Sequence, residues 1–267
     1  MSAVGDLKRD GYIILKNYIP QSDLNTCIQR LESLYADHWS SADVVAKAAP
    51  IGIQNLIKND RVINNVFLYD DIFLRLASTG VHRDIIGALF NDIHYRCIPE
   101  NEHNYILSQF NARDGQSALP FHVDVRLQIG NEKTWSLQCL LSVDKLDAEN
   151  GALRVRPGSH LDDGMPDSKR DYDDSVTLET DPGDLIIFYS NLHHATCPNR
   201  SARRGWTLLL TYRAWWCKQQ FDIWGMMKNK AHHLTKQQQL LLGGCSVPST
   251  DPYSSLSLRT GYEALEK

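Results

Sequence analysis

The sequence predicts a mainly β protein, an antiparallel sandwich or barrel that carries a helical layer at its N-terminal side. The main observation is a series of short segments rich in Ile, Leu, Val, Tyr and Trp, which alternate with turn residues after Pro99. The second observation is that apolar residues recur at helical spacing before that point. Short strands at roughly regular spacing are typical of sandwiches and barrels, not of α/β folds.

Residues 1–98 are expected to form an N-terminal strand and a helical layer. A polar lead precedes the segment DGYIIL at 10–15, whose apolar run predicts a short strand. Ser22 is expected to be the N-cap of the helix that follows. The residues that predict this helix by their spacing are Leu24, Ile28, Leu31 and Tyr35. Residues 60–97 are expected to be mostly helical.

Residues 104–216 are expected to form the β core. The expected strands are YILSQFN, VRLQI, WSLQCLLSV, ALRVR, SVTLE, DLIIFY and WTLLLTYRAWW. Residues 217–267 are expected to be helix and loop, with Thr235 as the N-cap of KQQQLLL and Gly243 as its end. No Pro/Gly/Ser-rich linker divides the chain, so we expect a single domain over residues 1–267.

Composition excludes several classes of partner and site. The formal net charge of -4 gives no electrostatic reason to bind nucleic acid. No apolar run approaches the roughly 18 residues of a membrane span, and the N-terminal segment has no signal-peptide core. The six cysteines form no CxxC pair, which argues against a thiolate zinc site and a disulfide framework. We therefore expect a cytoplasmic protein.

Histidine is the informative residue type, because the chain contains three His-x-Asp triplets, at 82–84, 122–124 and 160–162. On a strand, side chains two residues apart share a face and can bind one metal ion. The triplet at 82–84 falls in an expected helix, where such residues diverge, and the triplet at 160–162 follows Pro-Gly-Ser in an expected solvated turn. The triplet at 122–124 enters the β core and is the favoured candidate.

A third ligand would complete a known type of iron site. Two histidines and one carboxylate on one face of an octahedron are typical of non-haem Fe(II) oxygenases, and they leave three positions open. The strand that begins with DLIIFY is expected to continue to His193 and His194. Strand alternation allows only one of these two histidines to face a given side. The residues alone leave both of them open.

The order of these motifs resembles the phytanoyl-CoA dioxygenase family of Fe(II)- and 2-oxoglutarate-dependent oxygenases. The resemblance extends from residue 10 to about residue 213. It implies a double-stranded β-helix (a cupin-like jelly roll) with the N-terminal helices packed on it. The matching motifs are DGYIIL at 10–15, FHVD at 121–124, ENGALRVRPGSH at 149–160 and PGDLIIFYSNLHHATCPNRS at 182–201.

The resemblance implies His122, Asp124 and His194 as the iron ligands. The family pattern places the last ligand eleven residues after the glycine of Gly-Asp and five before the asparagine of Pro-Asn-x-Ser. Both counts lead to His194. His193 is then expected to be its outward neighbour.

The co-substrate implied by the family, 2-oxoglutarate, needs an anchor for its far carboxylate, and an arginine fork suits that group. In the family this arginine begins the strand after the Pro-Asn-x-Ser turn, so Arg200, Arg203 and Arg204 are candidates, and the choice is between Arg203 and Arg204. Arg203 alternates with Thr207, whereas Arg204 shares a face with bulky Trp206. The turn is shorter here than in the family, which leaves the choice open. Arg203 is the favoured candidate.

Three further residues are candidates for contact with the co-substrate. Thr196 lies two residues after His194, at a position where the family often has a hydroxyl group. Gln109 and Asn111 share one face of the expected strand before the favoured triplet.

The resemblance implies a dioxygenase that uses Fe(II), 2-oxoglutarate and O2 to hydroxylate an unactivated C–H bond of a small molecule, releasing succinate and CO2. Related halogenases have a small residue at the position of Asp124, so halogenation is not expected. Two alternatives are a non-catalytic jelly-roll module that binds or senses a small molecule, and a cupin-like metalloenzyme without 2-oxoglutarate. A monomer or a homodimer is expected.

Overall fold

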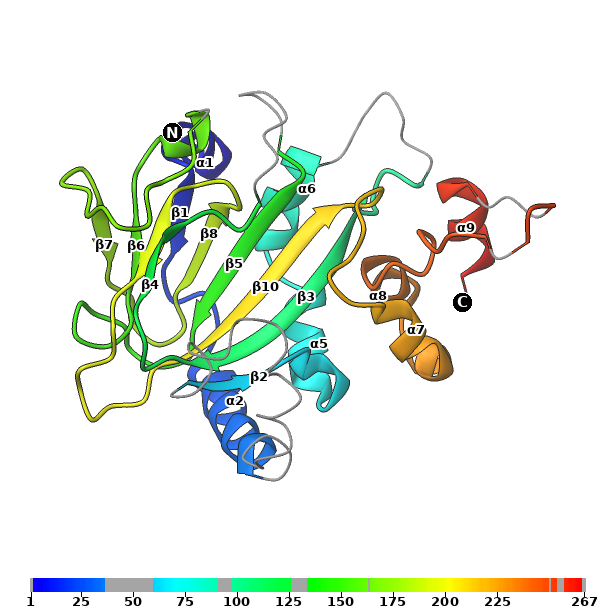
Figure 1. Cartoon of the computed structure of the whole chain (residues 1–267). Coiled ribbons are helices and arrows are strands. Elements are labelled where there is room, and N and C mark those ends of the chain that lie inside the picture. The colour runs from blue at the N-terminus through cyan, green and yellow to red at the C-terminus, as the bar shows by residue number, and fades with distance from the viewer. Residues whose placement is uncertain are drawn as a thin grey trace.

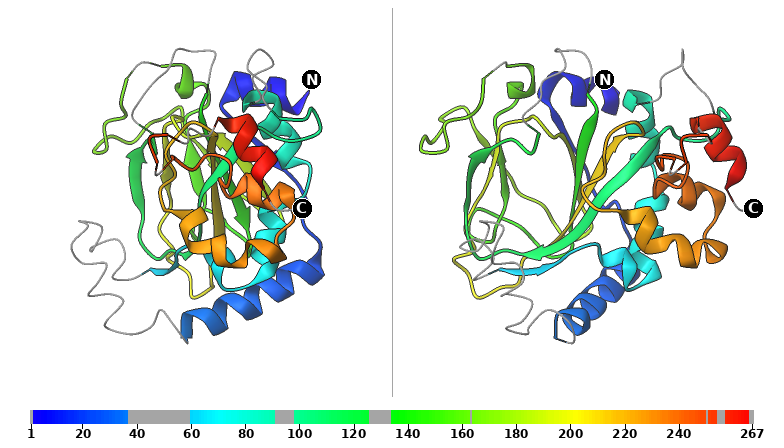
Figure 2. Two further views of the ribbon diagram at one scale, coloured as in Figure 1. Left: turned by 90° about the vertical axis from the view of Figure 1, so that its right-hand side faces the viewer. Right: turned by 45° about the vertical axis from the view of Figure 1, so that its right-hand side comes forward.

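Two antiparallel sheets face each other at the centre of the protein (Figure 1, Figure 2). This computed structural model describes residues 2–36, 60–90, 98–125, 134–162, 164–249, 251–253 and 257–265. The larger sheet has the strand order β1-β8-β5-β10-β3-β2, and the smaller has β4-β9-β6-β7. The strands are β1 (Tyr12–Leu15), β2 (Arg61–Ile63), β3 (Tyr105–Asp114), β4 (Leu119–His122), β5 (Ser136–Ser142), β6 (Leu153–Val155), β7 (Val176–Leu178), β8 (Leu185–Tyr189), β9 (His194–Thr196) and β10 (Trp206–Ala214).

The chain crosses repeatedly between the two sheets after β3. It passes to β4 in the smaller sheet, returns to β5, crosses to β6 and β7, returns to β8, and repeats the crossing for β9 and β10. This path is that of a double-stranded β-helix, which is a jelly roll. The predicted fold class, a mainly β core with helical additions, is confirmed.

Helices pack on the outer face of the larger sheet (Figure 1). Trp206 of β10 donates its indole N–H to Glu32 at 2.8 Å, and the hydroxyl of Tyr212 lies 2.8 Å from Nε2 of His82. These residues of β10 therefore face the helices, and by alternation Thr211 and its neighbours two residues away face the inside of the barrel. The helices of this layer are α1 (Ala3–Asp10), α2 (Gln21–Leu34), η3 (Val66–Leu68), α5 (Asp71–Ser78) and α6 (His82–Phe90).

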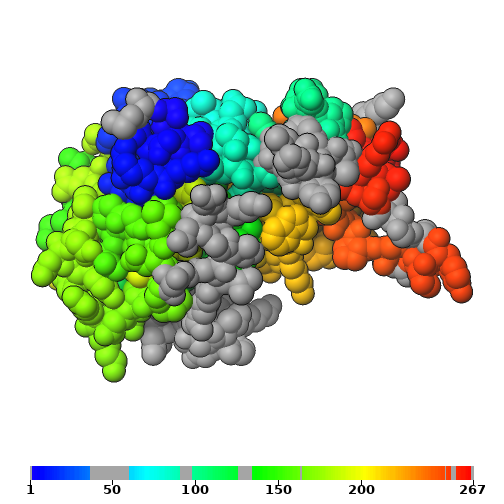
Figure 3. Space-filling view, turned by 90° about the horizontal axis from the view of Figure 1, so that it is seen from above, coloured from blue at the N-terminus to red at the C-terminus, as the bar shows by residue number. Residues whose placement is uncertain are grey.

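The two ends of the chain lie at opposite ends of the molecule (Figure 3). Helix α1 lies beside α6. The C-terminal part consists of α7 (Ile223–Met227), η5 (Lys228–His233), α8 (Lys236–Leu241) and α9 (Leu258–Ala264). Thr235 caps α8 in a capping box with Gln238, as predicted, and Gly243 follows the helix with φ of 90°.

The N-terminal segment differs in two ways from its prediction. The polar lead is helix α1, which Ser2 caps and Gly11 ends at a φ of 82°. Helix α2 has nearly the predicted extent, but its N-cap is Pro20 and not Ser22. A proline with fixed φ suits a helix start because the first turn has no use for its missing N–H.

The region before the core contains a strand that periodicity did not predict. Within 60–97 the described residues are mostly helical, as expected, but β2 pairs with the end of β3 over three positions. Three residues are too few to show a period of two. Residues 91–97, and residues 126–129 of the expected strand VRLQI, lie outside the described residues.

The segment DLIIFYSNLHH was expected to be one strand and is two. Strand β8 ends at Tyr189 in the larger sheet, and β9 begins at His194 in the smaller one. The amide of Leu192 donates to the carbonyl of Tyr189 at 2.9 Å in the turn between them. The crossing of the chain between the sheets makes this break necessary.

One hydrophobic cluster extends from Leu7 to Leu242 and contains residues of both sheets and of the helical layer. A smaller cluster joins α8 and α9. No inner boundary separates the helical layer from the barrel in this cluster, so we propose the single domain expected above. None of the described helices combines the length and the apolar character that a bilayer crossing requires.

The Pro-Gly-Asp turn at 182–184 joins β1 to the core. Gly183 has a φ of 94°, and its carbonyl accepts the amides of Tyr18 and Ile19. The buried carboxylate of Asp184 accepts hydrogen bonds from Lys16 Nζ at 2.7 Å and from the amide of Asn17 at 2.9 Å. Burial acts to raise the pKa of Asp184, but Lys16 and the backbone amides outweigh it, so that the pKa is lowered.

We expect Asp184→Asn to lower the free energy of unfolding at pH 7 by about 2 kcal/mol, because a buried carboxylate that accepts from Lys16 and from backbone amides loses its charge and one of its two acceptor oxygens. A lowered pKa stabilises the fold above the carboxyl range, and this contribution is lost as the pH falls through it. The difference between wild type and variant should therefore shrink below about pH 4. Urea unfolding at several pH values measures it, with Asp181→Asn in the same turn as an exposed control. An equal loss of unfolding free energy in the two variants would contradict the stabilising role given to the Asp184 carboxylate.

Candidate metal site

Strands β4 and β9 bring two histidines together. They pair antiparallel with His122 directly opposite His194. Residues directly opposite each other project from the same face of a sheet. Asp124 lies just beyond the end of β4, where its amide donates to the carbonyl of Ser190 at 2.9 Å. The turn after β8 thus fixes the position of the carboxylate relative to both histidines.

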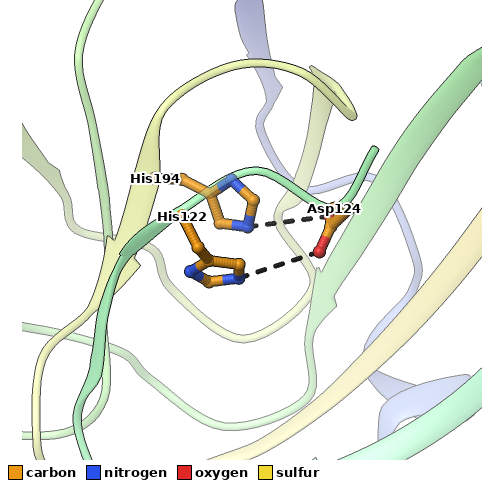
Figure 4. Close-up of side chains that lie close together, drawn as sticks. All are labelled: His122, Asp124 and His194. Carbon is orange, nitrogen blue, oxygen red and sulfur yellow. Dashed lines mark ion pairs between the residues drawn. The ribbon is translucent and has the colours of Figure 1, made fainter. Parts of the chain in front are cut away.

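The three side chains converge on one point (Figure 4). Nε2 of His122 lies 3.7 Å from Oδ1 of Asp124, and Nε2 of His194 lies 3.6 Å from Oδ2. One possible ligand atom from each residue lies within 4.8 Å of the others. In the described part of the chain no other group of His, Cys, Asp and Glu has this geometry. We call His122, Asp124 and His194 the triad.

Hydrogen bonds select the tautomer of both histidines. Nδ1 of His122 lies 2.8 Å from the carbonyl of Pro120, and Nδ1 of His194 lies 2.9 Å from the carbonyl of Leu192. A carbonyl only accepts, so each Nδ1 carries the proton and each Nε2 presents a lone pair to the carboxylate. With both rings neutral, the three groups face one another as acceptors and can hold a cation between them. This donor set fits Fe(II).

Burial favours the neutral form of the distal histidine. The side chain of His194 is 5% exposed, and burial lowers its pKa, although the nearby Asp124 acts in the opposite direction. The ring of Phe188 packs edge-on against the imidazole, with 5.1 Å between centroids. A neutral imidazole is the form that binds a metal ion.

His193 points away from the triad. Its Nε2 donates to the carbonyl of Gly164 at 2.9 Å, and its Nδ1 accepts from Arg156 at 3.0 Å. These bonds attach the loop after η4 (Ser159–Leu161) to the outside of the smaller sheet. The alternation along the strand thus separates the two adjacent histidines.

The other two triplets have structural roles. His82 begins α6 and is hydrogen-bonded on both sides, to the hydroxyls of Tyr18 and Tyr212. His160 was expected in a solvated turn but is 5% exposed, with Nε2 donating to the carbonyl of Lys8. The prediction of solvent exposure is wrong for His160, because the N-terminal helix covers it.

Four polar side chains form a continuous hydrogen-bonded row on the inner wall of the barrel. The row, here called the polar ladder, consists of Asn111, Gln109, Thr211 and Gln138. Asn111 donates to Gln109 at 3.3 Å, Gln109 donates to Thr211 at 3.0 Å, and Thr211 donates to Gln138 at 2.6 Å. Gln138 lies opposite Phe188, whose ring contacts the triad. The two predicted residues of β3 therefore share the interior with the triad.

Thr196 also faces the interior. It lies two residues after His194 on β9 and opposite Leu119, and its hydroxyl accepts the amide of Leu119 at 2.9 Å. Accepting that bond leaves its own proton free to donate. The sequence analysis did not identify Thr211 and Gln138. Each has a polar residue two positions away in its strand, and this spacing indicates a shared polar face.

Arg203 and Arg204 are not brought to the triad. Both precede β10, in a turn where the side-chain amide of Asn199 donates to the carbonyl of Arg203. Arg203 forms an ion pair with Asp147 at 2.7 Å, and Arg204 forms one with Asp144 at 3.1 Å. Strand alternation does not extend to residue 203, because the strand begins at residue 206. Their role as co-substrate anchors stays a prediction, and each would first have to leave its carboxylate.

Comparisons with related sequences identify the family. The model of the phytanoyl-CoA dioxygenase (PhyH) family matches residues 7–205. Dioxygenase cdmD of Talaromyces verruculosus is 32% identical over 224 residues, which cover 74% of this chain and 69% of that protein. A probable phytanoyl-CoA dioxygenase of Caenorhabditis elegans is 22% identical over 222 residues, covering 73% and 69%. Dioxygenase trt7 of Aspergillus terreus is 39% identical over only 72 residues, 26% of this chain and 25% of that protein.

Solved structures have the same fold at low identity. The non-heme alpha ketoglutarate dependent epimerase SnoN from nogalamycin biosynthesis has a TM-score of 0.59 at 16% identity, over 80% of this chain and 82% of that chain. EctD from S. alaskensis, crystallised with 2-oxoglutarate and 5-hydroxyectoine, has a TM-score of 0.60 at 19% identity, over 80% and 76%. These structures support the jelly roll, and the sequence match over most of the chain decides the family. This chain belongs to the phytanoyl-CoA dioxygenase (PhyH) family.

Proposed function

We propose that this non-haem Fe(II)- and 2-oxoglutarate-dependent dioxygenase holds iron through the triad and hydroxylates an unactivated C–H bond of a small molecule, releasing succinate and CO2. The observation that carries the proposal is the convergence of two imidazole lone pairs and a carboxylate within 4.8 Å. When bound, Fe(II) supplies the activation of O2 at the positions that three protein ligands leave open.

The residues around the triad orient and shield the ligands. The carbonyls of Pro120 and Leu192 hold both imidazole rings in the tautomer that presents Nε2. The ring of Phe188 covers one side of the distal imidazole and keeps water from it. Rings held in this way do not have to reorient when the metal ion binds, which favours tight binding of the metal.

The interior polar groups supply contacts for 2-oxoglutarate. Thr196 lies on the same face of the smaller sheet as the triad histidines, and the polar ladder lies on the inner face of the larger sheet opposite them. Both can donate to carboxylate oxygens. We retain Arg203 as the candidate for the far carboxylate. Its pair with Asp147 is partly exposed, and such pairs contribute at most about 1 kcal/mol, so that exchange for a bound carboxylate is feasible.

Arg204 is the weaker candidate of the two arginines. It lies near two carboxylates, those of Asp144 and Glu32. Glu32 belongs to α2, in the layer outside the barrel. The side chain of Arg204 therefore extends along the helical layer, as Trp206 does two residues later.

Asp124 favours hydroxylation over halogenation. Its carboxylate takes the third ligand position, which a halide ion would need. The structural relatives include an epimerase and an enzyme crystallised with a hydroxylated compound, so that the fold permits more than one outcome. A non-catalytic binding module would have no use for three ligands held in this geometry.

The decisive experiment is an anaerobic titration of the purified protein with Fe(II) and then 2-oxoglutarate. A visible charge-transfer band that appears only with both supports the proposal. Succinate release in air, measured over a panel of small molecules, then identifies those that stimulate turnover above the uncoupled rate. No band and no succinate would reject it.

We expect Asp124→Ala and His194→Ala each to lose bound iron and turnover, because each removes one of three converging ligands. His193→Ala should keep one iron per chain, since the His193 side chain bonds only to Arg156 and Gly164. Metal analysis and succinate release measure these effects, and circular dichroism checks the fold. Loss of iron in His193→Ala with iron retained in His194→Ala would reverse the assignment.

We expect Arg203→Ala to weaken 2-oxoglutarate binding by about tenfold or more, because a carboxylate loses its charged partner. Arg204→Ala should change the affinity less than about threefold. The anaerobic band, followed during 2-oxoglutarate titration, measures both affinities, and iron content should be unchanged. If neither variant loses affinity, the far carboxylate is bound by the interior polar groups instead.

A further inference from the structure

Arg213 lies near the end of β10 and faces the inside of the barrel. It lies opposite Ser136 of β5, and its side chain shares a face with the polar ladder. The hydroxyl of Ser136 hydrogen-bonds that of Ser190 at 2.8 Å, and the carbonyl of Ser190 accepts the amide of Asp124. Only β5 thus lies between the strand of Arg213 and the turn after β8 that holds the backbone of Asp124.

The guanidinium of Arg213 has unused hydrogen-bonding capacity. Nη1 donates to the carbonyl of Lys218 at 2.8 Å, while Nε is buried and has no partner among the described residues. A buried donor without a partner costs free energy, and a bound water, ion or ligand can satisfy it. Its Cζ lies 5.9 Å from the centroid of the Trp135 ring.

Arg213 also has no ion pair with any described carboxylate, in contrast to the arginines around the barrel. Those that do form such pairs are Arg61, Arg113, Arg154, Arg156, Arg203 and Arg204. Burial lowers the pKa of Arg213, and Cys217 and Asp124 act in the opposite direction. An arginine still keeps its charge at neutral pH, so the described residues provide no anionic partner for this cation.

The nearby Asp124 is not available as that partner. Its two oxygens face the Nε2 atoms of the two triad histidines, at 3.7 and 3.6 Å. A metal ion at the triad would engage the same oxygens. An anion that enters the site therefore meets a second positive charge beside the metal.

We propose that Arg213 binds a carboxylate of the primary substrate and so sets the class of molecule that the enzyme oxidises. The inference rests on the proposed function, because it places the substrate beside the triad. Nε and the second terminal nitrogen of a guanidinium can hold both oxygens of a carboxylate at once. The ring of Trp135 offers an apolar surface next to that charge.

The position of Arg213 along β10 favours binding of the primary substrate, and not of the co-substrate, by this side chain. Its side chain reaches past the end of the strand, toward Lys218. The polar ladder lies further from this end of β10, because Thr211 precedes Arg213 on the strand and Asn111 pairs still earlier in it. A co-substrate held by the ladder would leave the strand end near Arg213 open for the primary substrate.

The test uses protein loaded with Mn(II), which binds oxygen and nitrogen ligands without turnover, and saturated with 2-oxoglutarate. The probes are matched pairs of a carboxylic acid and its primary amide, benzoate with benzamide and hexanoate with hexanamide. Paramagnetic relaxation of probe protons reports binding next to the metal. We expect the acids to bind about 10- to 100-fold more tightly than the amides.

Arg213→Gln should abolish this preference, and Arg213→Lys, which keeps the charge but loses the fork, should retain part of it. Arg154→Gln is the matched control, because Arg154 lies on the outer face of β6 beside Phe121 and pairs with Asp171. The affinity for 2-oxoglutarate, measured by the anaerobic Fe(II) band, should be unchanged in all three variants.

Three results would overturn the inference. The first is equal binding of acids and amides to wild type, and the second is a preference for acids that survives in a folded Arg213→Gln variant. A loss of 2-oxoglutarate affinity in Arg213→Gln would instead assign the arginine to the co-substrate. Failure of the proposed function is distinguishable from these, because wild type would then give no Fe(II) band with 2-oxoglutarate.

Discussion

The pairing of β4 with β9 is the constraint on which the site depends. It places His122 directly opposite His194, although the two residues are far apart in the chain. A shift of one residue would turn His194 out of the barrel and bring His193 in, because side chains alternate along a strand. The larger sheet, the helical layer and the Pro-Gly-Asp turn hold this register by closing the barrel around it.

The site is built so that it is incomplete without a cation. Both imidazole rings donate Nδ1 protons to backbone carbonyls, and the lone pairs on Nε2 face a carboxylate. Repulsion among these acceptors is a cost that the fold tolerates, since the surrounding strands fix each group. Metal binding and folding are coupled at such a site, because the ion relieves that repulsion.

The polar groups inside the barrel form two sets, which differ in their position along β10 and in their hydrogen bonding. The members of the polar ladder hydrogen-bond one another, whereas Arg213 at the strand end has an unpaired Nε among the described residues. Most arginines around the barrel are neutralised by carboxylates of neighbouring elements. This distribution leaves one strongly directional donor beside the triad, and it gives a physical basis for selection among small molecules.

The sequence by itself determined the fold class, most strands of the core, and the three residues of the triad, because a period of two and the family motifs are local patterns. It did not predict α1, the short β2 or the break between β8 and β9, since these depend on what covers or crosses them. It also could not show that His160 is buried or that Arg203 pairs with Asp147. Only the tertiary structure decided these points, because burial and ion pairing join residues that are distant in the chain.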